Sequence, residues 1–143
     1  MDYSQYGALA LAYMGDCVYE IKIREFLMRQ ANMPVNMLHR KAKGYVSAAA
    51  QSAFVDKLLP LLTEEEESVF HRGRNAKPHT TPKNMTLSDY KKATGLEALF
   101  GYLYLSGKTE RIDELMEIII NEEPSLSAVG HRDHSPKSHY FGT

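Results

Sequence analysis

Two carboxylates in the chain stand out because each interrupts an otherwise apolar stretch. Asp16 lies within LAYMGDCVYE, residues 11–20, and Glu97 lies within ATGLEALFGYLYL, residues 93–105. An ionised carboxylate buried without a partner is strongly destabilising, so each acid should be ion-paired, protonated or bound to a metal. If both stretches are helices that cross at these positions, Asp16 and Glu97 converge on one site.

A site of two converging carboxylates, with no histidine or second cysteine beside them, favours a hard divalent cation, Mg²⁺ or Mn²⁺. Such a cation can activate a water molecule near neutral pH and stabilise the charge that develops on a phosphate. The alternative is a structural role, in which each acid accepts backbone N–H bonds or pairs with Lys22, Arg24 or Lys92. The residues alone leave metal chemistry and ion pairing open.

Basic side chains are concentrated in one segment of a chain whose formal net charge is only −1. Residues 72–92 contain six lysines and arginines and a single acid, Asp89, and a smaller basic group occupies residues 39–43. This asymmetry permits an electropositive face that would attract phosphates. Solvated helix surface would produce the same pattern, so charge alone does not decide between the two.

The elements that would position these residues are predicted to be helices. Apolar residues recur at helical spacing, and no stretch alternates as a strand would. Thr63 with Glu66, and Thr86 with Asp89, predict capping boxes that open two of the helices. Prolines and a serine–glycine pair separate the elements, which gives expected helices over residues 5–28, 36–59 (straight or bent at Gly44), 63–75, 86–105 and 109–121.

A chain of 143 residues organised in this way is expected to form one all-α domain, a helical bundle, over residues 1–122. Residues 123–143 are rich in serine, glycine and histidine and are expected to form a mobile tail. No apolar run reaches the roughly 20 residues that span a bilayer, and the N-terminus lacks the basic region of a secretory signal. A single cysteine, Cys17, excludes an internal disulfide. We therefore expect a cytoplasmic protein with no membrane contact.

Both carboxylate-bearing stretches resemble signature sequences of one family. LAYMGDCVYE resembles the signature of ribonuclease III, roughly Leu-Glu-Phe-Leu-Gly-Asp-Ala-Val-Leu-Glu, and ATGLEALFGYLYL resembles that family's second acidic helix. Together with HRKAKGYVSAAAQ, RGRNAK and PKN, the chain looks like Mini-III, the bacterial branch of the family that has only the nuclease domain. The resemblance covers about residues 5–120 and agrees with the all-α prediction.

The resemblance implies a ribonuclease III-type endonuclease domain in a symmetric homodimer. It implies that Asp16 and Glu97 are catalytic metal ligands and that Tyr13 packs across the dimer interface. The implied reaction is Mg²⁺-dependent hydrolysis of double-stranded RNA to 5′-phosphate and 3′-hydroxyl ends, with Mn²⁺ as a substitute cation. The implied cellular role is maturation of the large-subunit (23S) ribosomal RNA precursor, where a ribosomal protein would shape the substrate. Glu20, which closes the signature, is either a surface salt-bridge partner or a site residue.

Two positions depart from the pattern of the larger family. Ala12 stands where the family has a glutamate, and Thr94 stands where it has an aspartate. Fewer direct ligands should leave more water on the metal, and they leave the number of metal ions, one or two, open. Thr94 shares a helix face with Glu97 and could orient such a water. The alternative function is a non-catalytic dimer that binds double-stranded RNA and retains the fold.

The basic segments gain a role from the resemblance, because a nuclease without an accessory RNA-binding domain must hold phosphates with its own surface. Recognition of an RNA duplex should depend on A-form shape, phosphates and 2′-hydroxyls. The candidate contacts are Arg40, Lys43, Arg72, Arg74, Asn75, Lys77, Lys83 and Asn84.

Overall fold

The computed structural model describes residues 1–77 and 82–121, and within these ranges every regular element is helical. A short 3₁₀ helix, η1 (Tyr3–Gln5), precedes the long helix α1 (Ala8–Gln30). The remaining elements are α2 (Val35–Val46), α3 (Ala48–Leu58), η2 (Leu59–Leu61), α4 (Glu64–Asn75), α5 (Leu87–Leu105) and α6 (Thr109–Asn121). The all-α prediction is confirmed, and the predicted tail over residues 123–143 lies outside the described residues.

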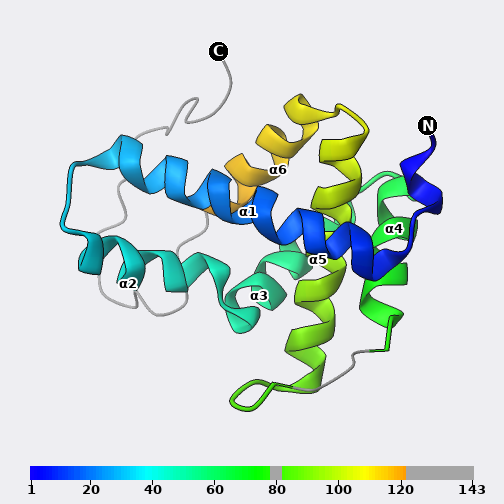
Figure 1. Ribbon diagram of the computed structural model, residues 1–143, viewed down its shortest axis with the longest axis horizontal. Helices are drawn as coiled ribbons and strands as arrows, with labels where there is room; N and C mark the ends of the chain where they lie inside the picture. The colour runs from blue at the N-terminus through cyan, green and yellow to red at the C-terminus, as the bar shows by residue number, and fades with distance from the viewer. Residues whose placement is uncertain (78–81, 122–143) are drawn as a thin grey trace.

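Helix α5 lies at the centre of the bundle, where α1, α3, α4 and α6 pack against it, and α2 packs against α1 and α3 (Figure 1). From Ala93 to Leu103 all of its residues are buried except Glu97, which is partly exposed. Figure 1 shows α1 running across α5, with α4 beside α5. The apolar sequence of α5 is therefore explained by its neighbours. Within the described residues, no helix is both long enough and apolar enough to cross a bilayer.

The crossing of α1 and α5 is close because a glycine stands on each helix. A Cβ atom added to Gly15 would lie 1.6 Å from the backbone oxygen of Glu97, and one added to Gly101 would lie 1.9 Å from that of Leu11. Any larger side chain at either position would therefore force the two helices apart. This contact places the segment around Asp16 against the segment around Glu97.

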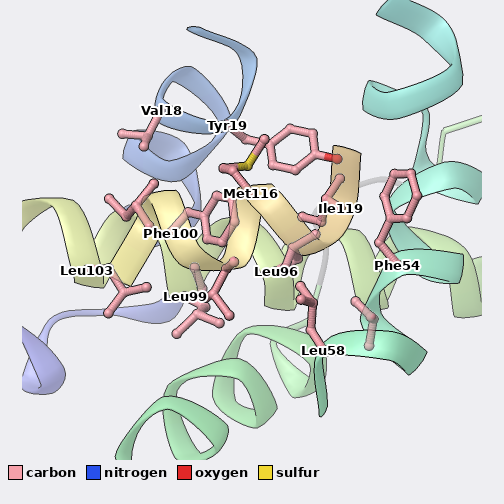
Figure 2. Packing of buried hydrophobic residues seen from close by; sticks show 14 of the residues in the cluster. Val18, Tyr19, Phe54, Leu58, Leu96, Leu99, Phe100, Leu103, Met116 and Ile119 are labelled. Carbon is pink, nitrogen blue, oxygen red and sulfur yellow. The ribbon is translucent and has the colours of Figure 1, made fainter. Parts of the chain in front are cut away.

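The hydrophobic core fills the space around α5 (Figure 2). Tyr19 from α1 packs near Phe100 of α5, with ring centroids 5.5 Å apart, and its hydroxyl donates a hydrogen bond to the Tyr45 carbonyl at 2.6 Å. Met116 and Ile119 bring α6 onto the same core. Complete burial of a large apolar side chain contributes roughly 1.5–3 kcal/mol relative to exposure, so this cluster holds α5 in place.

The segment predicted as one helix over residues 36–59 forms two helices, α2 and α3. The chain turns at Ser47, whose φ of −63° and ψ of 154° are extended. Of the two alternatives, straight or bent at Gly44, neither matches the structure, because the break falls at Ser47 and Gly44 lies within α2. The Ser47 hydroxyl accepts a hydrogen bond from the Ala50 N–H at 3.1 Å and caps α3. Serine favours the N-cap over the helix interior, which explains why a new helix begins here.

The caps predicted for α4 and α5 are present to different extents. Thr63 and Glu66 form the complete capping box predicted for the start of α4. At the start of α5, the Thr86 hydroxyl accepts a hydrogen bond from the Asp89 N–H at 3.0 Å, which is one of the two bonds of the box predicted there. Each cap satisfies backbone N–H groups that have no partner within the helix.

Glu66 also joins α4 to α6. It is only 4% exposed, and Arg111 donates to its two carboxylate oxygens from Nε and Nη2, each at 2.9 Å. Burial alone would raise the pKa of Glu66, but the hydrogen bonds from Arg111 and from the Thr63 N–H hold this pKa below its ordinary value. This carboxylate is therefore buried with its charge compensated.

Candidate active site

The crossing of α1 and α5 brings Asp16 and Glu97 together. Burial raises the pKa of the Glu97 carboxyl to about 7, and the charge of Asp16 and a hydrogen bond with it contribute to the same shift. The helix crossing agrees with this, because Gly15, the residue before Asp16, lies against the backbone of Glu97. The structure thus brings together two acids from distant parts of the sequence, as expected from the apolar stretches that carry them.

Asp16 itself is not an interior residue, contrary to the expectation from its apolar neighbours in the sequence. Helix α1 buries one face, which includes Leu11, whereas Asp16 and Cys17 are exposed. The apolar residues that suggested burial include Tyr13, which is 84% exposed. The carboxylate pair therefore forms at the edge of the helix crossing, with Glu97 partly buried and Asp16 open to solvent.

The basic side chains considered as ion-pair partners of the two acids are paired with other carboxylates. The pairs are Lys22 with Asp113 at 2.8 Å, Arg24 with Glu20 at 2.7 Å, and Lys92 with Asp56 at 3.4 Å. Glu20 thus forms the surface salt bridge that is one of its two expected roles. These pairs do not support a purely structural explanation of Asp16 and Glu97.

A buried amide, that of Gln51 in α3, contacts Glu97. Its Nε2 donates to Glu97 Oε2 at 3.3 Å and to the Val46 carbonyl at 3.0 Å. The bond to Glu97 opposes the rise in the Glu97 pKa, because it stabilises the ionised carboxylate. Gln51 is not among the predicted site residues, although its helical spacing is a signal: Gln51, Val55 and Leu58 lie on one buried face of α3.

Ala12 and Thr94, which stand where the larger family has carboxylates, are both buried. The Thr94 hydroxyl donates a hydrogen bond to the Tyr90 carbonyl of its own helix at 3.0 Å. In residues 1–77 and 82–121, no group of three or more histidine, cysteine, aspartate or glutamate side chains could hold a metal. The site offers two hard carboxylate donors, which fit Mg²⁺ or Mn²⁺ with water or phosphate completing the coordination.

The basic side chains predicted to bind RNA lie on three parts of the molecule. Helices α2 and α4 lie on opposite sides of α5 (Figure 1). The exposed or partly exposed candidates are Arg40 and Lys43 on α2, Arg74, Asn75 and Lys77 at the end of α4, and Lys83 and Asn84 before α5. The structure therefore distributes these residues over α2, the end of α4 and the segment that precedes α5.

Arg72 differs from the other basic candidates because its guanidinium is engaged within the protein. Its two terminal nitrogens donate hydrogen bonds to the backbone carbonyls of Ser4 and Tyr6. These bonds hold the residues before α1 against α4. Arg72 therefore has a structural role, and contact with an RNA phosphate stays a prediction for this residue.

The stretch that carries both acids matches a known family. Residues 9–108 match the profile of the family described as Ribonuclease III domain. The chain belongs to the ribonuclease III family. Similar curated proteins named Mini-ribonuclease 3 include one from Enterococcus faecalis, 48% identical over 85% of this chain and 93% of that protein. Another, from Clostridium tetani, is 44% identical over 96% of this chain and 91% of that protein.

A crystal structure of a protein from Fusobacterium nucleatum is similar to this ribonuclease III-family chain. The two are 35% identical, with a TM-score of 0.76 over 83% of this chain and 95% of that one. The predicted resemblance to the Mini-III branch is confirmed. Ribonuclease III enzymes are endoribonucleases that act on double-stranded RNA, so the α1–α5 crossing is the candidate active site of an endoribonuclease.

Proposed function

We propose that this chain is a Mg²⁺-dependent endoribonuclease that hydrolyses double-stranded RNA, with Asp16 and Glu97 as catalytic metal ligands and Mn²⁺ as a substitute cation. The observation that carries the proposal is the carboxylate pair at the α1–α5 crossing, where Gly15, the residue before Asp16, lies against the backbone of Glu97. Burial and the charge of Asp16 raise the pKa of Glu97 to about 7, in agreement with this placement. Two adjacent carboxylates repel each other, and a divalent cation held between them would stabilise both in their ionised forms. Membership of the ribonuclease III family supports RNA as the substrate class.

Asp16 and Glu97 have different proposed roles in the site. When bound, Mg²⁺ supplies Lewis acidity for the in-line attack of water on a phosphodiester. The exposure of Asp16 makes the pair accessible to water and to an RNA phosphate. Glu97, which approaches from the protein interior, is held by the packing of α5 and by the Gln51 amide. Hydrolysis of this kind would leave 5′-phosphate and 3′-hydroxyl ends.

The exposed basic and amide side chains around α5 would bind the RNA backbone. Each phosphate that a lysine or arginine neutralises releases counterions, so duplex binding should weaken as salt rises. The contacts would be made to phosphates and 2′-hydroxyls of the A-form duplex, with little reading of base sequence. The proposed contacts are Arg74, Asn75, Lys77, Lys83, Asn84, Arg40 and Lys43.

The proposal includes a symmetric homodimer. Helix α1 exposes several large apolar side chains, among them Tyr13 at 84%, Ile21 at 64% and Met28 at 58%. Exposed apolar surface of this extent is typical of a protein interface. Two copies that pack through Tyr13 would present two sites to one duplex and make staggered cuts, one on each strand. Sedimentation equilibrium would measure the oligomeric state directly.

The proposed cellular role is maturation of the large-subunit (23S) ribosomal RNA precursor in the cytoplasm, with a ribosomal protein shaping the substrate. Its support is the similarity to proteins named Mini-ribonuclease 3. The single cysteine agrees with a reducing compartment.

Asp16→Asn tests the proposed function. The amide is nearly isosteric but carries no charge, so Mg²⁺-dependent cleavage of a structured RNA duplex should fall by several orders of magnitude. Asp56→Asn is the matched control, because Asp56 is an exposed aspartate whose partner is Lys92. The control should cleave at the unmodified rate. Cleavage by Asp16→Asn at that same rate would show that the assignment of Asp16 is wrong.

A non-catalytic dimer that binds double-stranded RNA is the second candidate function. The observation that favours it is the small number of acidic residues at the site. Ala12 and Thr94 replace two carboxylates of the larger family, and the described residues contain no group of three side chains that could hold a metal. If the unmodified protein binds duplex RNA but cleaves it in neither Mg²⁺ nor Mn²⁺, this second function replaces the first.

A further inference from the structure

Gln51 is a buried polar residue in the first turns of α3, on the face that packs toward α5. It is 3% exposed and shares that face with Val55 and Leu58. An amide buried without hydrogen bonds costs roughly 1–3 kcal/mol. An apolar side chain would therefore pack here more favourably, unless the amide contributes hydrogen bonds that the neighbouring residues need.

The hydrogen bonds of Gln51 determine the orientation of its amide. Nε2 lies 3.0 Å from the Val46 carbonyl oxygen and 3.3 Å from Glu97 Oε2, and both of these atoms are acceptors. Only the NH₂ group can donate two hydrogen bonds, and the flipped amide would place its oxygen against the Val46 oxygen. The amide is therefore a bridge between the end of α2 and the carboxylate of Glu97.

The other polar atom of the same amide, Gln51 Oε1, is buried and has no hydrogen-bond partner within the described part of the chain. Buried acceptors in folded proteins nearly always receive a hydrogen bond, from protein or from ordered water. This oxygen belongs to the same amide whose Nε2 contacts Glu97. A water molecule beside Asp16 and Glu97 is the donor that this position suits.

We propose that Gln51 is a positioning residue for the carboxylate pair: its Nε2 holds Glu97 toward Asp16, and its Oε1 accepts a hydrogen bond from a water molecule beside the two acids. The inference rests on the proposed function, since it assigns Gln51 to the same cation site. Ala12 and Thr94 leave that site with few direct ligands. The affinity for the cation should therefore depend more strongly on the orientation of Glu97 than it would in a site with four carboxylate ligands.

The other role open to Gln51 is structural, because its bond to the Val46 carbonyl caps the end of α2. Both roles predict a lower melting temperature when the amide is removed. Only the positioning role predicts weaker cation binding by the folded protein. Cation affinity, measured without RNA, therefore separates the two roles.

The test replaces Gln51 by Met, which keeps the length of the side chain and removes the amide. Mn²⁺ binding to the folded protein is measured by electron paramagnetic resonance, and the Mg²⁺ dependence of duplex cleavage is measured in parallel. Gln51→Met should bind Mn²⁺ roughly ten-fold more weakly and should recover cleavage at high Mg²⁺. Ser52→Ala is the matched control, because Ser52 is the adjacent buried polar residue at 6% exposure and should bind Mn²⁺ normally.

A second variant, Gln51→Asn, keeps an amide that is one methylene too short to contact Glu97, and its Mn²⁺ affinity should fall in the same way. An unchanged Mn²⁺ affinity in a folded Gln51 variant would overturn the positioning role and leave the helix cap. Asp16→Asn distinguishes the two proposals. If Asp16→Asn also binds Mn²⁺ normally, the proposed cation site itself is wrong, whereas loss of Mn²⁺ binding in Asp16→Asn alone overturns only the inference on Gln51.

Discussion

Glu66 and Glu97 are both glutamates withdrawn from solvent on helices that meet in the core, yet their surroundings are opposite. Glu66 receives two hydrogen bonds from Arg111 and one from the Thr63 N–H. Glu97 faces the carboxylate of Asp16 and receives a hydrogen bond from one neutral amide. The pKa of Glu66 is held below its ordinary value, and that of Glu97 is raised to about 7.

The carboxylate of Glu66 therefore stabilises the fold, whereas the ionised carboxylate of Glu97 destabilises it. The Glu66–Arg111 pair joins α4 to α6 with its charges compensated inside the protein. The Asp16–Glu97 pair leaves negative charge uncompensated at an accessible edge, which is the arrangement expected of a cation site. Removing the charge should therefore have opposite consequences for stability in the two places.

Glu97→Gln should have the largest effect. Loss of a carboxylate ligand should reduce Mg²⁺-dependent cleavage by about a thousand-fold or more, which corresponds to roughly 4 kcal/mol. Stability should change in the other direction. The folded-state pKa of Glu97 lies above the unfolded value, so its ionised carboxyl destabilises the fold, and the neutral amide should raise the free energy of unfolding at pH 8 by about 1 kcal/mol.

The measurements are duplex cleavage, and urea unfolding in the presence of a chelator. Glu110→Gln, at an exposed position of α6, is the control and should change neither quantity. A large fall in the free energy of unfolding of Glu97→Gln without divalent cations would contradict the prediction that the ionised carboxylate of Glu97 destabilises the fold.

Gly15→Ala should damage both stability and activity. The added methyl group would overlap the Glu97 backbone, because its Cβ would lie 1.6 Å from that oxygen. Separating α1 from α5 should lower the free energy of unfolding by about 3 kcal/mol and draw Asp16 away from Glu97. Thermal unfolding and cleavage below the melting transition would measure the two effects. Gly7→Ser is the control, because nothing lies within 4 Å of the added Cβ and serine is accepted at the N-cap of a helix, so both quantities should stay nearly unchanged.

Glu66→Gln should lower stability and leave cleavage by the folded protein intact. The neutral amide leaves the partly buried Arg111 guanidinium without its charged partner, so the free energy of unfolding at pH 7 should fall by about 2 kcal/mol. Glu67→Gln, an exposed neighbour on α4, is the control for loss of one negative charge. Cleavage that falls in proportion to cation affinity would show that Glu66 acts on the site.

The pH dependence of Glu66→Gln follows from the direction of the Glu66 pKa. A depressed pKa means that the stabilisation is present above the ordinary glutamate pKa of 4.5 and is lost as the pH falls through the folded value. The unfolding free energies of Glu66→Gln and of the unmodified protein should therefore converge in acid. A constant difference between them down to acid pH would contradict the lowered pKa.

Glu20→Gln should have the smallest effect. The Glu20–Arg24 pair is solvent-exposed, with 40% and 63% of the two side chains accessible, and such pairs contribute about 0.5 kcal/mol or less. Unfolding should barely change and cleavage should stay at the unmodified rate. A strong loss of cleavage in a folded Glu20→Gln protein would instead place Glu20 in the active site.

The helices and both acids were predictable because their signals are local. Prolines, threonine N-caps and helical apolar spacing define α1, α4, α5 and α6 to within a few residues. Asp16 and Glu97 stand out as charges within apolar stretches. The break at Ser47 was missed because the apolar spacing continues through it, and a single serine hydroxyl that caps the next helix decides the boundary.

Other features could not be read from local patterns, because they depend on which surfaces meet. Arg72 is in a basic segment, yet it binds the carbonyls of Ser4 and Tyr6, which are distant in sequence. Gln51 contacts Glu97 only because α3 packs against α5. The exposure of Asp16 and Tyr13 depends on which face of α1 lies against the bundle.

The sequence by itself determined that this protein is helical, that two acids lie in its most apolar helices, and that it resembles ribonuclease III. Those properties follow from residue type and spacing along one chain segment at a time. Only the tertiary structure decided that a glycine crossing sets Asp16 beside Glu97, that an amide from a third helix holds Glu97, and that Arg111 neutralises Glu66. The physical reason is that the energy of a buried charge depends on the groups that packing brings within a few ångströms of it.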